Sequence, residues 1–205
     1  MGNAAKTVVI ATNNAHKVSE ITTALDFDGW EFKTLAEVSV ASNPAEDADS
    51  FEGNARIKAN AAREACRAAG LEVATLADDS GLEVDALGGA PGVYSSRYAG
   101  VDGDDAANNA KLLRELAGVA DDDRTARFVC TLVFLDVDGT DHVARGVVEG
   151  RIGREGRGSE GFGYDPLFFP DEFEGERTLA EVSQSQKNAI SHRGRALREL
   201  RAKLA

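Results

Sequence analysis

The sequence predicts an α/β domain built around a mixed β-sheet. Short β-branched runs alternate with segments of helical periodicity, and the two most strand-like runs, 128–136 and 142–149, are separated by Asp138-Gly139, which favours an antiparallel hairpin. With 205 residues and 42% hydrophobic content, the chain is long enough to bury a full core. We therefore expect a single domain covering residues 1–205.

Each half of the chain contributes its own elements, which hydrophobic periodicity and helix-stop residues delimit. In the N-terminal half we expect a strand at 7–11, a helix marked by Val18, Ile21 and Leu25, a strand at 30–34, a polar loop at 39–50 and a helix at 51–69 that ends at Gly70. Further along the chain we expect a buried strand at 73–77, a helix at 108–116 and the hairpin. A glycine-rich loop at 150–163 follows, then a capping box at Thr178 and Glu181, and a final amphipathic helix marked by Leu197, Leu200 and Leu204.

The composition argues against several classes of protein. A formal net charge of -12 repels nucleic acid polymers, so we expect no extended DNA- or RNA-binding surface. The sequence has no apolar run of about eighteen residues and no signal-peptide pattern, so we expect a cytoplasmic protein that neither inserts into a membrane nor is exported. Cys66 and Cys130 lack metal-ligand spacing, and we interpret both as core residues.

The first chemistry-bearing stretch lies between the first predicted strand and the first predicted helix. It consists of Thr12, Asn13, Asn14, Ala15, His16 and Lys17. Free backbone N–H groups and the helix dipole attract anions at such a position, and the hydroxyl, amide and ammonium groups add to that attraction. Because the stretch does not match the P-loop pattern, a polar turn with a helix N-cap is the competing interpretation.

Two adjacent carboxylates, Asp78 and Asp79, follow the predicted strand 73–77, where we expect a turn. Adjacent carboxylates raise each other's pKa unless a cation or hydrogen bonds neutralise them, and a hard cation such as Mg²⁺ prefers oxygen ligands. Glu46 and Asp47 in the preceding loop add enough acidic groups to hold one metal ion. An Asp-rich turn without a metal is the alternative.

Two further stretches combine aromatic rings, glycines and cations. Residues 161–166, Gly-Phe-Gly-Tyr-Asp-Pro, suit the stacking of a base and hydrogen bonding to its edge, although core-anchoring aromatics are the simpler interpretation. Residues 187–193 place Lys187, His192 and Arg193 at the start of the predicted last helix, where cations oppose the helix dipole. Such a local misfit is typical of a functional site, while a solvated basic face is the alternative.

In this order the stretches resemble the inosine triphosphate pyrophosphatase family, also called the non-canonical purine NTP pyrophosphatases, over nearly the whole chain. The most specific matches are Thr12 to Lys17, Phe51-Glu52-Gly53-Asn54-Ala55 with Lys58, Ala77 to Leu82, Gly88-Gly89-Ala90-Pro91-Gly92, Gly161 to Pro166, and Ser191-His192-Arg193. The resemblance implies an elongated fold of two lobes with a central substrate cleft, and a homodimer. It also implies Mg²⁺-dependent hydrolysis of ITP, dITP or XTP to a nucleoside monophosphate and pyrophosphate.

The resemblance further implies roles for individual residues. Asp79 matches the general base and a metal ligand, and Glu46 is the best match for a second metal ligand. The triphosphate would be held by Thr12, Asn13, Asn14, Ala15, His16 and Lys17, with help from Ser80. The nucleotide-binding loop would comprise Phe162, Gly163, Tyr164 and Asp165, and the base would be read by Lys187, His192 and Arg193.

This chain departs from the usual pattern of that family in two places. Glu46-Asp47-Ala48 stands one residue short of the family's Glu-Glu-Thr-Gly stretch, and Gly53 replaces a glutamate. Asp47 therefore stays the alternative to Glu46 as the second metal ligand.

The implied roles suggest a mechanism. Asp79 would deprotonate a water that attacks the α phosphorus, while Mg²⁺ and Lys17 offset negative charge. Cationic donors would favour the six-oxo group of hypoxanthine and xanthine over the amino group of adenine. Two alternatives are a related house-cleaning pyrophosphatase for pyrimidine or modified nucleotides, and a regulatory module that binds a purine triphosphate without cleaving it.

Overall fold

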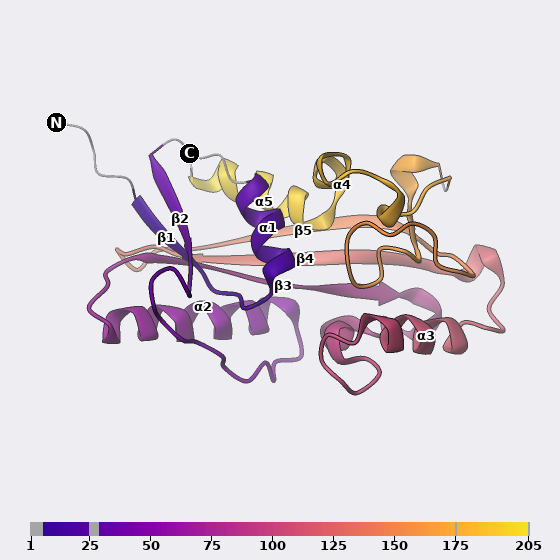
Figure 1. Cartoon of the computed structure of the whole chain (residues 1–205), viewed down its shortest axis with the longest axis horizontal. Helices are drawn as coiled ribbons and strands as arrows, with labels where there is room; N and C mark the ends of the chain where they lie inside the picture. The colour runs from indigo at the N-terminus through magenta and orange to yellow at the C-terminus, as the bar shows by residue number, and fades with distance from the viewer. Residues whose placement is uncertain (1–5, 25–28, 175, 205) are drawn as a thin grey trace. The chain divides into compact units, whose positions relative to one another are not determined.

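The computed structural model describes residues 6–24, 29–174 and 176–204, and it confirms the α/β class (Figure 1). Within these residues a six-stranded sheet has the strand order β2-β1-β3-β4-β5-β6. The strands and α-helices are β1 (Lys6–Ile10), α1 (Ala15–Ala24), β2 (Trp30–Thr34), α2 (Phe51–Ala68), β3 (Ala74–Val84), α3 (Asp105–Glu115), β4 (Thr125–Leu135), β5 (Asp141–Ile152), β6 (Phe168–Pro170), α4 (Gln184–Ile190) and α5 (His192–Leu204). The predicted Leu25 lies outside the described residues.

The sheet is mixed, as predicted. Strand β1 runs parallel to both β2 and β3, with Val8 opposite Phe32 and Ala74, whereas β5 and β6 are antiparallel. Strands β4 and β5 are neighbours joined by residues 136–140, a connection so short that only an antiparallel pair can use it. The predicted hairpin is therefore present.

The predicted turn at Asp78 is wrong, because β3 continues through the acidic pair to Val84. The strand that ends here is its neighbour. Ile10, the last residue of β1, is opposite Leu76, and the backbone N–H of Ala11 donates to the carbonyl oxygen of Leu76. Asp78 and Asp79 therefore lie beyond the end of β1, and each is paired with a lysine from a helix.

The chain divides into two compact units, and the first comprises the described residues within Met1–Asp79, Cys130–Arg145 and Ala196–Ala205. Its sheet strands are covered on both faces: α2 lies on one face, and α1 and α5 lie on the other (Figure 1). Because side chains alternate along a strand, Val8 and Ile10 pack with Ile21 and Leu197, while Val9 packs in the separate cluster of α2. Cys66 and Cys130 are buried in these clusters, which confirms their interpretation as core residues.

The second unit comprises Ser80–Val129 and Gly146–Arg195 and has one core cluster of its own. Leu112 of α3 and Leu116, the residue that follows this helix, pack there with Phe128 of β4 and with Phe168 of β6. The predicted capping box at Thr178 and Glu181 is present, although it opens a short 3-10 turn and not a longer helix. Among the described helices, none is both long and apolar enough to cross a bilayer. The elongated shape with two lobes and a cleft stays a prediction.

Candidate functional site

The stretch from Thr12 to Lys17 forms the entry to α1. Its fold is set by Asn14, whose side-chain oxygen accepts from the backbone N–H groups of His16 at 2.9 Å and Lys17 at 3.1 Å. Asn14 is thus a helix N-cap, and two of the N–H groups expected to attract an anion are already bonded. Thr12 Oγ1 accepts from the N–H of Asn14, and Asn13 Nδ2 donates to the carbonyl of Ser42. The cap interpretation is therefore correct, and binding of phosphate by the side chains of this stretch stays a prediction.

Lys17 extends from this turn to a buried carboxylate. Its Nζ atom lies 2.5 Å from Oδ1 of Asp78, whose side chain is fully buried. The other oxygen of Asp78 accepts a hydrogen bond from the thiol of Cys130 at 2.9 Å. Both oxygens of Asp78 are therefore engaged, and the carboxylate fixes the position of the Lys17 ammonium.

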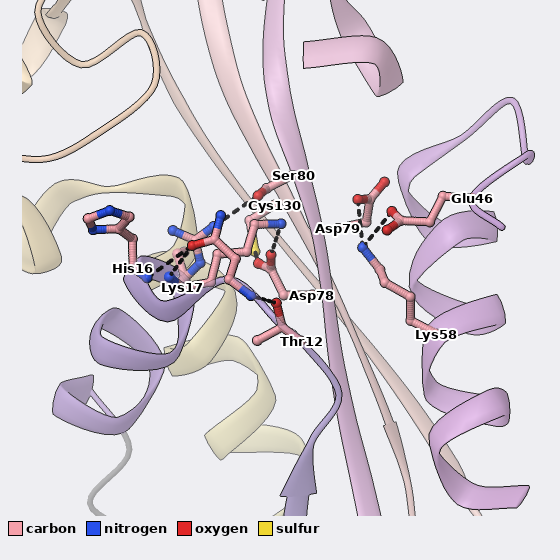
Figure 2. A network of polar contacts seen from close by, with 11 residues as sticks. Thr12, His16, Lys17, Glu46, Lys58, Asp78, Asp79, Ser80 and Cys130 are labelled. Carbon is pink, nitrogen blue, oxygen red and sulfur yellow. Dashed lines mark hydrogen bonds and ion pairs between the residues drawn. The ribbon is translucent and has the colours of Figure 1, made fainter. Parts of the chain in front are cut away.

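Asp79 forms an ion pair with a different lysine, Lys58, which the sequence did not assign to the site. Lys58 of α2 donates from Nζ to Oδ1 of Asp79 at 2.9 Å and to Oε2 of Glu46 at 2.8 Å. Figure 2 shows this trio on the α2 side of β3, with Asp78 and Lys17 on the other side. Two acidic groups 33 positions apart in the chain thus share one ammonium group.

The two aspartates point to opposite faces of β3 because successive side chains of an extended strand alternate. Asp78 faces α1 and Asp79 faces α2, so Lys17 and Asp79 do not form a direct pair (Figure 2). They still interact through space, since the positive charge of Lys17 is among the influences that lower the pKa of Asp79. A common role of Lys17 and Asp79 at one triphosphate stays a prediction.

The electrostatics of Asp79 are dominated by burial. Desolvation raises the pKa of Asp79 above its ordinary value, and the attraction of Lys58 only partly reverses that rise. For Lys58, burial alone would lower the pKa, but Asp79 and Glu46 outweigh it and the pKa is raised. Lys58 is thus a firmly charged ammonium. The second oxygen of Asp79, Oδ2, is buried and makes no hydrogen bond, so it is available to a water or a cation.

Glu46 is held in place by the way its loop closes on the start of α2. Ser50 caps this helix by accepting from the N–H of Gly53, and the side-chain oxygen of Asn54 accepts from the N–H of Ala48. A Cβ atom on Gly53 would lie 2.6 Å from Cβ of Ala48, so a larger residue would push the loop away. The glycine that stands at position 53, where the family usually has a glutamate, therefore allows Ala48 to lie close to the start of α2. Asp47 is exposed, which favours Glu46 as the group that acts with Asp79.

The carboxylate oxygens of Asp79 and Glu46 fit a divalent cation that is bound together with phosphate. Asp79 offers an unbonded Oδ2, and Glu46 lies on the same ammonium group. Within the described ranges no three acidic, histidine or cysteine side chains gather into a complete metal cage. Mg²⁺ usually takes one or two carboxylates from a protein and completes its coordination with phosphate oxygens and water. Two carboxylates therefore suit this ion.

The second unit holds a buried ion pair next to an aromatic ring. Lys187 Nζ lies 2.6 Å from Oδ2 of Asp165, and each side chain is 3% exposed. The same Asp165 oxygen accepts from the N–H of Phe162 at 2.9 Å. Lys187 Nζ stands 4.7 Å from the centre of the Phe162 ring, and the guanidinium of Arg193 is 6.0 Å from it. The predicted residues Phe162, Asp165, Lys187 and Arg193 are therefore brought together.

The cations of this cluster lie on two helices and not on one. Lys187 is in the last turn of α4, where a cation suits the helix dipole, and only His192 and Arg193 begin α5. The expected misfit at a helix start therefore applies to His192 and Arg193 alone. Arg193 donates from Nη2 to Oγ of Ser80 at 2.9 Å, and the His192 ring stacks on Phe128 with centroids 4.8 Å apart.

Tyr164 plays a structural part in this cluster. Its ring belongs to the core of the second unit, and its hydroxyl donates to the carbonyl of Ser95 at 2.9 Å. The interpretation of this tyrosine as a core anchor is therefore supported by its packing. Gly161 has a left-handed backbone, and a Cβ there would lie 2.1 Å from Oδ2 of Asp165, so both backbone and space require glycine.

Comparison with known proteins places the chain in a family. The family model described as the Ham1 family matches residues 8–203. The chain belongs to the Ham1 family. This confirms the resemblance that the motifs indicated, since Ham1-family relatives carry the name dITP/XTP pyrophosphatase.

Two such relatives are from Exiguobacterium sibiricum and Clostridium perfringens. The first is 48% identical over 96% of this chain and 96% of its own, and the second is 47% identical over 97% of each chain. Among solved structures, a HAM1 protein from Coxiella burnetii has a TM-score of 0.84 and 40% identity, covering 97% of this chain and 98% of its own. The Staphylococcus aureus Ham1 protein has a TM-score of 0.83 with the same coverages and 39% identity.

Sequence reasoning missed two residues of this candidate site. Lys58 was noted only as part of a motif, although a lysine among the alanines of a buried helix face is itself a signal, because a buried ammonium needs a carboxylate partner. Phe128, which stacks on His192, gave no such signal, because an aromatic residue in an apolar strand is typical of a core.

Proposed function

We propose that this protein hydrolyses non-canonical purine nucleoside triphosphates, namely ITP, dITP and XTP, to a nucleoside monophosphate and pyrophosphate. Such an activity would remove deaminated purine nucleotides from the nucleotide pool. The observation that carries the proposal is the buried carboxylate of Asp79, with one oxygen fixed by Lys58 and the other unbonded, in a chain nearly half identical to relatives named dITP/XTP pyrophosphatases.

Asp79 is proposed as the general base. Lys58 holds Oδ1, so the orientation of the carboxylate is fixed and Oδ2 is left to accept a proton from water. The water oxygen forms a bond to the α phosphorus, the bond from that phosphorus to the bridging oxygen breaks, and pyrophosphate leaves. A pKa raised by burial makes Asp79 a stronger base than an ordinary aspartate, provided that it is ionised.

The phosphate chain is assigned to Lys17 and to the acidic residues that would hold the metal ion. Lys17 would bind phosphate oxygens with its ammonium, and Asp78 and Cys130 would keep that ammonium in a fixed place. Mg²⁺ held by Asp79 and Glu46 would offset charge on the triphosphate and on the leaving pyrophosphate. Ser80, bonded to Arg193, is proposed as a further contact to the substrate.

The base is assigned to Phe162 and the cations around it. The Phe162 ring offers a stacking surface, and Lys187, His192 and Arg193 supply donors for the six-oxo group of hypoxanthine or xanthine. Adenine carries an amino group at that position, which would face another donor. Homodimer formation and a cytoplasmic location belong to the same proposal, on the strength of the resemblance and the composition.

The test is an assay of pyrophosphate release from ITP with Mg²⁺ and with a chelator. We expect hydrolysis with Mg²⁺, a loss of at least about a hundredfold in rate on chelation, and recovery when Mg²⁺ is restored. ITP binding without pyrophosphate release would favour a regulatory module instead. Faster hydrolysis of a pyrimidine or modified nucleotide than of ITP would favour the related house-cleaning enzyme.

A further inference from the structure

Two side chains of α3 hold the backbone of the loop that carries Phe162. The backbone N–H of Gly163 donates to Oδ2 of Asp105 at 2.7 Å, and the carbonyl oxygen of Gly163 accepts from Nδ2 of Asn109 at 2.9 Å. Asp105 and Asn109 are four positions apart on one helix, so they project from the same face. All three residues belong to the second unit.

This pair of bonds fixes the conformation of Gly163 itself. The N–H lies in the peptide plane shared with Phe162, and the carbonyl lies in the plane shared with Tyr164, so both planes beside Gly163 are held. Gly163 has a left-handed φ of 63°, and nothing lies within 4 Å of the place where a Cβ would stand. Glycine is therefore required here for its backbone conformation and not for space.

The direction of the Phe162 ring is set by hydrogen bonds on both sides of Gly163. Tyr164 is fixed in the core through Ser95, and the N–H of Phe162 is bonded to Asp165. With both torsions of Gly163 held by α3, the Phe162 ring has one direction relative to these anchors. That direction places it beneath the ammonium of Lys187.

We propose that Asp105 and Asn109 are positioning residues, which set the Phe162 stacking surface and thereby the affinity for the purine base. This inference rests on the proposed function and adds two residues to it. Neither side chain needs to touch the substrate. Their effect is carried by Gly163, so it falls on binding of the base and not on cleavage of the phosphate bond.

The test combines two isosteric changes with one truncation, all made in the whole chain. Asn109→Asp keeps the shape but turns a carboxylate oxygen toward the Gly163 carbonyl, whereas Asp105→Asn keeps an acceptor for the Gly163 N–H. We expect Asn109→Asp and Asp105→Ala to raise KM for ITP about five- to tenfold, with kcat within about twofold, because each loses one hydrogen bond. Asp105→Asn should restore a nearly normal KM. Arg114→Ala, an exposed change on the same helix, is the control.

Hydrogen exchange of the amides of residues 161–165 provides a second readout that does not depend on catalysis. Exchange should be about fivefold faster in Asn109→Asp and Asp105→Ala than in the wild type, and unchanged in Arg114→Ala. Unchanged exchange in both loop variants would overturn the inference whether or not the enzyme acts on ITP. Faster exchange with a normal KM would overturn it as well, while a wild-type protein inactive on ITP would refute the proposed function alone.

Discussion

Replacing Asp79 by asparagine is expected to lower kcat for ITP roughly a thousandfold, the usual contribution of a general base. Asparagine has the same shape but cannot take a proton from water. The fold should survive, because burial raises the pKa of Asp79 and the folded state therefore does not favour its charged form. Pyrophosphate release and thermal unfolding measured on the same preparation check both statements. A variant with wild-type kcat would refute the assignment of Asp79.

The pH dependence should change with the same substitution. In the wild type, kcat/KM should rise as pH increases through the pKa of Asp79, which lies above the ordinary aspartate value, because only the ionised form is a base. The asparagine variant should lack that rise over about pH 4 to 8. Asp85→Asn is the control, since Asp85 is a half-exposed carboxylate just after β3 that pairs with Arg127. It should keep the wild-type profile.

The second large effect concerns the choice of base. We expect kcat/KM for ITP to exceed that for ATP by about 10⁴, because a donor-lined site leaves buried groups unpaired against adenine. Removing Lys187 alone would take away the ammonium that pairs with the buried carboxylate of Asp165, and breaking a buried ion pair from one side typically destabilises a fold by about 3–5 kcal/mol. The informative change is therefore the double variant Lys187→Met with Asp165→Asn, which removes both charges and keeps an acceptor for the N–H of Phe162.

In that double variant the ratio of ITP to ATP efficiency should fall about a hundredfold, the discrimination that one strong donor–acceptor match provides. Competition assays with both nucleotides measure the ratio directly. Lys111→Met makes the same chemical change at a lysine of α3 that bonds the carbonyl of Tyr98, so its ratio should stay unchanged. If the double variant kept the full ratio, Lys187 would not be the reader of the six-oxo group.

The acidic pair illustrates how far the sequence could lead. Two adjacent aspartates after a buried run predict a turn at the end of their own strand, and that prediction is wrong. The strand that ends there is β1, since β3 continues, and this fact depends on the sheet register. Once the residues are known to be in a strand, alternation of side chains sends Asp78 and Asp79 to opposite faces. Their separate lysines follow from that alternation.

Lys17 and Lys58 differ in how far the sequence alone could identify them. Lys17 is a candidate from the sequence alone, because it lies in a recognisable polar stretch between a strand and a helix, but its pairing with Asp78 comes from the structure. Lys58 comes from the middle of α2 and meets Asp79 21 positions away, so only tertiary packing brings them together. The N-cap at Asn14 could be predicted from the sequence, since asparagine before a helix is a common N-cap.

Lys187 and Arg193 both lie near the Phe162 ring, but the prediction of a single helix over residues 187–193 is wrong. One helix was expected across 187–193, whereas α4 ends at Ile190 and α5 begins at His192. The signals for both starts are present in the sequence. Ser183 and Gln186 form a capping box, and the hydroxyl of Ser191 accepts from the N–H of Gly194. The hydrogen bonds from Asp105 and Asn109 to Gly163, by contrast, join residues more than fifty positions apart, so only the structure could reveal them.

The central claim is that water attacks the α phosphorus of a non-canonical purine triphosphate. Hydrolysis of ITP in water enriched in ¹⁸O, followed by mass spectrometry of both products, tests it most directly. The account predicts one heavy oxygen in inosine monophosphate and none in pyrophosphate. Heavy oxygen in the pyrophosphate, or release of inosine diphosphate and phosphate, would contradict it.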